Sequence, residues 1–288
     1  MIYLLLSIAS SSIIFVVFKL FSRFKINTLH AIVVNYITAS TLGILLYQGG
    51  VVISSIPQQD WFFNAVALGF LFILIFNLMA LTTQRSGLSV VSVATKMSVV
   101  IPILFGILYY KESLGILKAS GIIIALIAVY LASVKSKDGI PFKKTTLIFP
   151  ALVFLGSGII DISIKYIEGK YLNTGDLPMF LTTVFGTAGI VGLLIIGSQM
   201  LRKRFTFDIK NILAGICLGI PNYGSMYFLV KALRHDTFDS STIFTINNVG
   251  VVMISTFIGI TLFTEKLQFK NWIGIALAVI SIILVSLS

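Results

Sequence analysis

The sequence predicts an all-α integral membrane protein with ten transmembrane helices, arranged as two inverted five-helix repeats. Three observations predict this fold: the composition, the spacing of the apolar runs and an internal repeat. Of the 288 residues, 57% are hydrophobic and only 11% are charged, whereas soluble domains contain about 25% charged residues. Because so much apolar surface needs lipid around it, we expect a chain embedded in a bilayer and not one or two soluble domains.

Ten apolar runs, each bounded by charges, Gly or Pro, are long enough to cross a hydrocarbon core of about 30 Å. The connections between them are too short to form a domain outside the membrane. The first run has no basic segment before it, so we expect a retained helix and not a signal peptide. The expected spans are residues 2–21, 29–47, 61–81, 88–110, 114–133, 146–166, 177–200, 211–230, 242–263 and 271–287.

The ends of the two halves resemble each other. Residues 259–286 overlay residues 106–133 with ten identities in 28 positions, and Glu265 falls on Glu112. Apolar composition alone explains some of the Ile and Leu matches, but it does not explain a matched Glu.

The beginnings of the two halves also match. Residues 157–174 overlay residues 11–28 with six identities in 18 positions, and Lys165 falls on Lys19. We therefore expect one repeat over residues 1–137 and a second over 138–288. An odd number of spans makes the second repeat enter the bilayer from the opposite side, as in many secondary transporters. Duplication also builds static channels and scaffolds, so that alternative stays open.

The span pair around Glu112 has a recognisable pattern. Pro102 lies ten residues before this Glu and Gly121 lies nine residues after it. The pattern resembles the EamA-type domain of the drug/metabolite transporter superfamily. The resemblance implies a ten-helix bundle around a central cavity, in the cell (inner) membrane, that moves a small metabolite by alternating access. The second copy departs from the pattern, because Ser255 stands where Pro102 predicts a proline.

The formal charge of +11 indicates membrane topology and not nucleic-acid binding, because the basic residues lie in short connections between apolar runs. Connections after even-numbered spans contain four Lys or Arg residues, and those after odd-numbered spans contain 13. The positive-inside rule then places both termini outside the cytoplasm, whereas the resemblance implies cytoplasmic termini. The 13 residues are Arg23, Lys25, Arg85, Lys135, Lys137, Lys143, Lys144, Arg202, Lys203, Arg204, Lys210, Lys266 and Lys270.

Charged side chains within the spans are costly in lipid and usually face a cavity or a partner. Lys96 lies nine residues into a 23-residue span, so we expect it to line the cavity and hold an anionic or zwitterionic substrate. Asp161 lies four residues before Lys165 and has two interpretations: it neutralises Lys165 on the same helix face, or it faces the cavity, where it pairs with Lys96 or takes up a coupling proton. Lys118 is close enough to its helix start to reach the headgroups.

Other polar residues complete the candidate substrate site. Lys19 and Lys165 lie near helix ends, where they snorkel to the headgroups or serve both repeats. Each Asn in a span has a structural alternative, a hydrogen bond to a neighbouring helix. Pro102 and Pro221 free backbone carbonyls, and Gly215 and Gly219 predict close helix packing. The candidate substrate-binding residues are Lys96, Asn35, Tyr36, Asn77, Asp161, Lys165, Lys19, Asn222, Tyr223, Asn247 and Asn248.

The predicted function is a secondary transporter of a small metabolite such as an amino acid or another carboxylate, with the proton as a candidate coupling ion, as a monomer or homodimer. We expect no catalytic residue, cofactor or metal, because His30 and His235 lie far apart and no phosphate loop is present. A static membrane subunit or channel remains the main alternative, ahead of a membrane-embedded enzyme. Glu112 and Glu265 are predicted to cap the helix that follows each of them.

Overall fold

Ten α-helices and one short 3₁₀ helix make up the described residues, 2–47, 53–101, 104–105, 115–133, 147–172, 176–201, 208–233 and 240–287 of a computed structural model, and no strand occurs in these ranges. The helices are α1 (Ile2–Arg23), α2 (Thr28–Leu45), η1 (Ile53–Gln58), α3 (Phe62–Ser86), α4 (Leu88–Met97), α6 (Ile116–Ser133), α7 (Ile148–Tyr171), α8 (Leu177–Leu201), α9 (Ile209–Leu233), α10 (Ser240–Thr261) and α11 (Phe269–Ser286).

Each α-helix falls on one of the expected spans. Five of them, α1, α2, α3, α8 and α9, contain described stretches long and apolar enough to cross a membrane, and the other five have shorter apolar stretches. Large apolar side chains remain exposed on the outside of the bundle, including Phe63 at 79% and Phe257 at 67%. An exposed apolar surface of this kind requires lipid, so the chain is a membrane protein.

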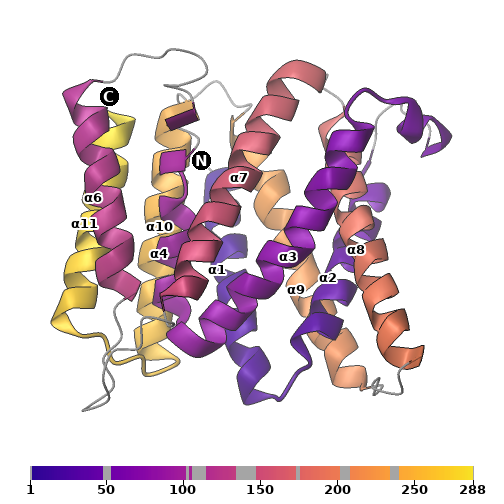
Figure 1. The fold of residues 1–288 in the computed structure, drawn as a ribbon, viewed down its shortest axis with the longest axis horizontal. Coiled ribbons are helices and arrows are strands. Elements are labelled where there is room, and N and C mark those ends of the chain that lie inside the picture. The colour runs from indigo at the N-terminus through magenta and orange to yellow at the C-terminus, as the bar shows by residue number, and fades with distance from the viewer. Residues whose placement is uncertain are drawn as a thin grey trace.

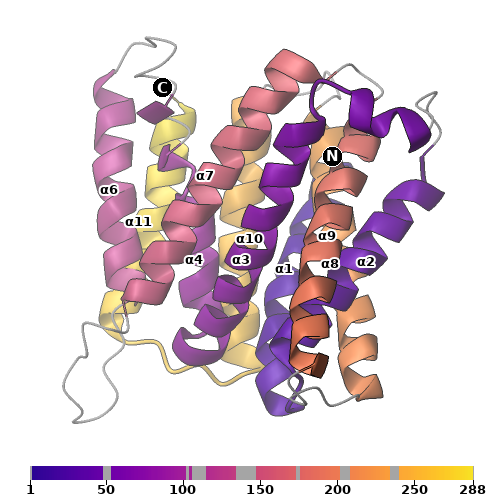
Figure 2. The same cartoon turned by 45° about the vertical axis from the view of Figure 1, so that its right-hand side comes forward.

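The helices form a single elongated bundle (Figure 1). At one end α6 packs along α11, and at the other end α2 packs between α8 and α9. Between these ends lie α1, α3, α4, α7 and α10, as the rotated view also shows (Figure 2). The two chain ends lie toward the same face of the bundle.

Two apolar clusters hold the bundle together. The larger one contains aromatic side chains from α1, α2, α3 and α8, among which Phe18 meets Phe76 edge to face and Tyr36 stacks on Phe185. The smaller one joins α4, α6, α10 and α11. Helix α4 contributes to both clusters, and it therefore connects the two ends of the bundle.

Helix α4 ends earlier than expected. The apolar run predicts one continuous span over 88–110, but α4 ends at Met97 and a turn follows at Ser98 and Val99. Pro102 has no N–H to donate to the Ser98 carbonyl, and this carbonyl instead accepts a hydrogen bond from the Ile101 amide at 2.8 Å. Pro102 itself lies outside the described residues.

Helix α9 behaves differently, because it continues through Pro221 without a break. Pro221 therefore frees a backbone carbonyl without ending α9. The predicted close packing at its glycines is confirmed: an added Cβ would lie 2.6 Å from the Ala31 carbonyl oxygen at Gly215 and 2.7 Å from the Asn35 carbonyl oxygen at Gly219. These glycines let α9 approach the α2 backbone directly.

Candidate functional site

Lys96 lies on α4 and Asp161 lies on α7, and these two helices pack against each other. The Ser98 hydroxyl lies 3.2 Å from Asp161 Oδ2 and donates a hydrogen bond to it. The Lys96 ammonium is close enough to interact electrostatically with this carboxylate. No ion pair of 4.0 Å or less joins the two groups, and Lys96 Nζ donates no hydrogen bond to any of the described residues.

This geometry leaves both charges available to a ligand. Lys96 is half-buried and Asp161 is exposed, although many protein atoms surround the Asp161 carboxylate. An ammonium at this depth needs water, a fixed acid or a bound anion beside it, since an unpaired charge in lipid costs at least about 2.5 kcal/mol. Asp161 lies too far away to neutralise Lys96 by direct contact. The Lys165 side chain, the other predicted partner of Asp161, lies outside the described residues.

A second polar set joins α2, α9, α1 and α10. Asn222 Nδ2 donates to Asn35 Oδ1 at 3.1 Å. The Ser7 hydroxyl lies 3.0 Å from both Asn247 Oδ1 and the Ser225 carbonyl oxygen. All five residues are buried, so their hydrogen bonds to one another stabilise helix contacts, as the structural alternative predicts.

The remaining uncharged candidates lie on different helices. The buried Tyr36 phenol donates to the Phe72 carbonyl oxygen at 2.8 Å, and Asn77 Nδ2 donates within its own helix at 2.7 Å. Tyr223 is buried with no hydrogen-bond partner for its hydroxyl among the described residues, and Asn248 is buried on α10. A cavity of about 190 Å³ between α3 and α7 contains none of the predicted site residues.

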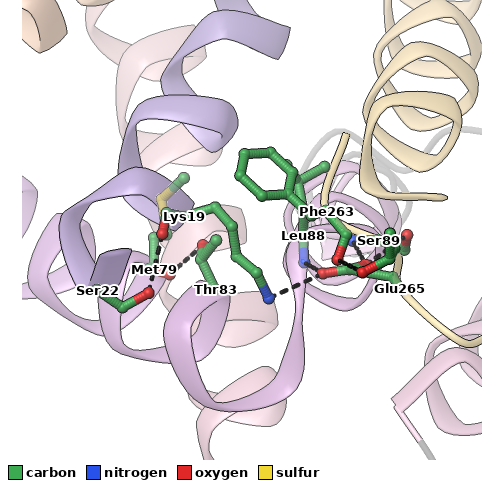
Figure 3. A network of polar contacts seen from close by, with 9 residues as sticks. Lys19, Ser22, Met79, Thr83, Leu88, Ser89, Phe263 and Glu265 are labelled. Carbon is green, nitrogen blue, oxygen red and sulfur yellow. Dashed lines mark hydrogen bonds and ion pairs between the residues drawn. The ribbon is translucent and has the colours of Figure 1, made fainter. Parts of the chain in front are cut away.

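A third polar set surrounds Glu265, in the connection between α10 and α11 (Figure 3). These contacts were not predicted from the sequence. Lys19 Nζ, on α1, lies 3.1 Å from Glu265 Oε1, and the Leu88 amide donates to the same oxygen at 2.8 Å. The Ser89 hydroxyl donates to Oε2 at 3.1 Å, and the Ser89 amide lies 3.4 Å from Oε2. We call these four residues, Lys19, Leu88, Ser89 and Glu265, the Glu265 cap.

The Glu265 cap corrects the expectation that Glu265 caps the helix after it. Glu265 caps α4 instead, and α11 has its own capping box formed by Gln268 and Asn271. The reason is that Gly87, at the N-cap position of α4, has no side chain to accept the first amides. Glu112, for which the same role was expected, lies outside the described residues.

Two glycines, Gly87 and Gly259, lie directly against the Glu265 carboxylate. Gly87 has φ +110°, and an added Cβ there would lie 2.8 Å from Glu265 Oε1. An added Cβ at Gly259 would lie 2.9 Å from Oε2. The two glycines therefore seat the carboxylate against the first turn of α4.

The surroundings of Glu265 stabilise its ionised carboxylate. Burial alone would raise the pKa of its carboxyl, but the hydrogen bond from the Leu88 amide and the charge of Lys19 together hold this pKa below its usual value. Glu265 is therefore ionised at neutral pH. Two features of the sequence could have suggested the contact between Glu265 and α4. The N-cap position of α4 is Gly87, which has no capping side chain, and both Lys19 and Glu265 recur in the internal repeat.

Comparison with known proteins identifies the source of the EamA resemblance. Residues 1–134 match the EamA-like transporter family. This stretch of the chain is therefore similar to that family. The similarity favours a membrane transporter of the drug/metabolite type. An uncharacterized protein of Haemophilus influenzae is 28% identical over 279 residues, which cover 94% of this EamA-like chain and 93% of its relative. A solved crystal structure has the same fold, with a TM-score of 0.61 at 13% sequence identity, over 98% of this chain and 96% of its own.

Proposed function

We propose that this EamA-like protein is a secondary transporter that moves a small carboxylate-bearing metabolite across the cell (inner) membrane by alternating access. Lys96 supplies the positive charge that holds the substrate carboxylate. The observation that carries the proposal is that the Lys96 ammonium and the Asp161 carboxylate interact electrostatically without forming a direct ion pair.

The internal repeat supports a functional role for this pair. The same overlay that matches Lys19 with Lys165 places Asp161 on Phe15, and the overlay that matches Glu265 with Glu112 places Lys96 on Val249. The two charges therefore occur once and not twice. A charge needed only to build the five-helix repeat would be expected in both copies, whereas one substrate site needs one set of charges.

Helix packing supports two repeats of inverted topology, over residues 1–137 and 138–288. If α1, α2, α3, α4 and α6 correspond in order to α7, α8, α9, α10 and α11, each major contact has a counterpart. Helix α2 packs on α9 as α8 packs on α3, and α1 packs on α10 as α7 packs on α4. Two halves related in this way can exchange conformations, which opens the site to either face in turn.

An amino acid fits the proposed site best, because it carries both charges that the site can pair. Its carboxylate binds Lys96 and its ammonium binds Asp161, which replaces the missing direct ion pair. A plain monocarboxylate satisfies only Lys96 and leaves Asp161 to water or to a coupling proton.

A thermal-shift measurement on the purified protein tests the proposal with a panel of amino acids, monocarboxylates and amines. At a ligand concentration of 100 times Kd, we expect the best amino acid to raise the unfolding temperature by roughly 5–10 °C. Lys96→Met should abolish the response to both acid classes, and Asp161→Asn should weaken the amino-acid response selectively. Lys118→Met is the matched control and should respond like the unaltered protein. A full response in Lys96→Met would overturn the proposal.

A further inference from the structure

We infer that the Glu265 cap is a gate, closed in this conformation, that must open for the transport site to reach the membrane face opposite the chain termini. This inference rests on the proposed alternating-access function and assigns Lys19 and Glu265 as positioning residues of that cycle. Lys19 and α4 belong to the first half of the chain and Glu265 belongs to the second (Figure 3). Any rocking of one half against the other must therefore separate them.

The location of the Glu265 cap suits a gate. The α1 C-terminus, the start of α4 and the connection between α10 and α11 meet at the face of the bundle away from the chain ends. Within the described residues the Lys19–Glu265 contact is the one ion pair of 4.0 Å or less. It lies at the edge of the membrane span, where 20% of the Lys19 side chain is exposed. Water can thus replace each partner when the contact breaks.

The junction between α3 and α4, next to the Glu265 cap, has the features of a hinge. Gly87, with φ +110°, joins α3 directly to α4 and contributes no side chain that fixes the angle between them. Helix α4 is held at its N-terminus by the Glu265 carboxylate through Leu88 and Ser89. A junction of this kind, in which a few residues absorb a backbone change, is the usual construction of a hinge.

Helix α4 also links the gate to the proposed substrate site. Lys96 follows Ser89 by seven residues, which is two helical turns or about 10 Å along the same helix face. A movement of the α4 N-terminus therefore displaces Lys96 as well. The repeat overlay gives Lys165 and Glu112 the corresponding sequence positions in the other half. Glu112 and the Lys165 side chain lie outside the described residues, so the test concerns Lys19 and Glu265 alone.

Cysteine accessibility tests the gate without any transported substrate. Cys217→Ser removes the single native cysteine, and Ser92→Cys then places a thiol between Ser89 and Lys96 at a position with 0% exposure. The alkylation rate with N-ethylmaleimide is measured on purified protein. Lys19→Met and Glu265→Gln each remove the ion pair, and we expect either change to accelerate labelling about tenfold. Lys266→Met, a loss of charge in the same connection outside the Glu265 cap, should leave the rate unchanged.

A second reporter separates gating from general loosening. Ala39→Cys, in the same cysteine-free background, places a thiol in α2 at a site that is also 0% exposed. It should stay protected in the Lys19→Met and Glu265→Gln proteins. The inference is overturned if labelling at Ser92→Cys does not change, or if both reporters become equally reactive. Because no ligand is present, such a failure is distinct from a failure of the thermal-shift test of Lys96.

Discussion

Gly87→Ala should be among the most destabilising single-methyl substitutions in the protein. An alanine at φ +110° stores about 1–3 kcal/mol of backbone strain. The added Cβ would also lie 2.8 Å from Glu265 Oε1 and displace the carboxylate from the α4 amides, and the lost charged hydrogen bonds are worth about 1.5–3 kcal/mol. The sum is about 2.5–6 kcal/mol.

The unfolding temperature of the protein in detergent measures this effect. We expect a decrease of roughly 5–24 °C for Gly87→Ala. Gly259→Ala should have a smaller effect, because its Cβ would crowd Oε2 at 2.9 Å but no positive φ adds strain. Gly197→Ala is the control: nothing lies within 4 Å of its added Cβ in α8, and Ala is favoured over Gly in a helix by up to about 1 kcal/mol. Equal unfolding temperatures for Gly87→Ala and Gly197→Ala would refute the reasoning.

Three further predictions concern acid stability, a buried phenol and orientation. Folding lowers the pKa of Glu265, so its ionised carboxylate stabilises the folded protein. This stabilisation is fully present above the ordinary glutamate pKa of about 4.3 and is lost as the pH falls through the lower pKa of the folded state. When the pH is decreased, the unfolding temperature of Glu265→Gln should therefore fall less steeply than that of the unaltered protein. Tyr36→Phe leaves the buried Phe72 carbonyl without its 2.8 Å donor and should cost about 1–2 kcal/mol in a denaturant titration; no change would contradict a structural role for Tyr36. A fluorescent protein fused after Ser288 should stay dark outside the cytoplasm if the basic connections govern insertion, and a bright cytoplasmic signal would instead favour the orientation implied by the family.

The helical spans were predictable from sequence because hydrophobicity over a membrane thickness is a local property. The early end of α4 was less predictable from sequence. Its cause is the backbone N–H that Pro102 lacks, and the effect of this missing donor depends on the neighbouring packing. The partner of Glu265 was not predictable by local rules. The glutamate was expected to cap the next helix in the chain, but the free amides at Leu88 lie 177 residues away and become neighbours only when the two halves pack.

The candidate site shows the same limit. Lys96 and Asp161 stand out in the sequence because charges are rare in apolar spans, and the structure brings them close enough to interact electrostatically. The buried asparagines Asn35, Asn222 and Asn247 stand out for the same reason, yet their hydrogen bonds join helices to one another. Sequence therefore identifies costly polar groups, and only the packing distinguishes those that are satisfied within the protein from those left available to a ligand.

Uptake into proteoliposomes tests most directly the claim that Lys96 holds the substrate of a carrier. The radiolabelled amino acid that gives the largest thermal shift is supplied outside, with and without the unlabelled compound inside. The account predicts saturable uptake that internal substrate accelerates, its loss in folded and inserted Lys96→Met protein, and nearly normal uptake by Lys118→Met. Normal saturable uptake by Lys96→Met would contradict the site, and uptake that never saturates would contradict the carrier and favour a channel.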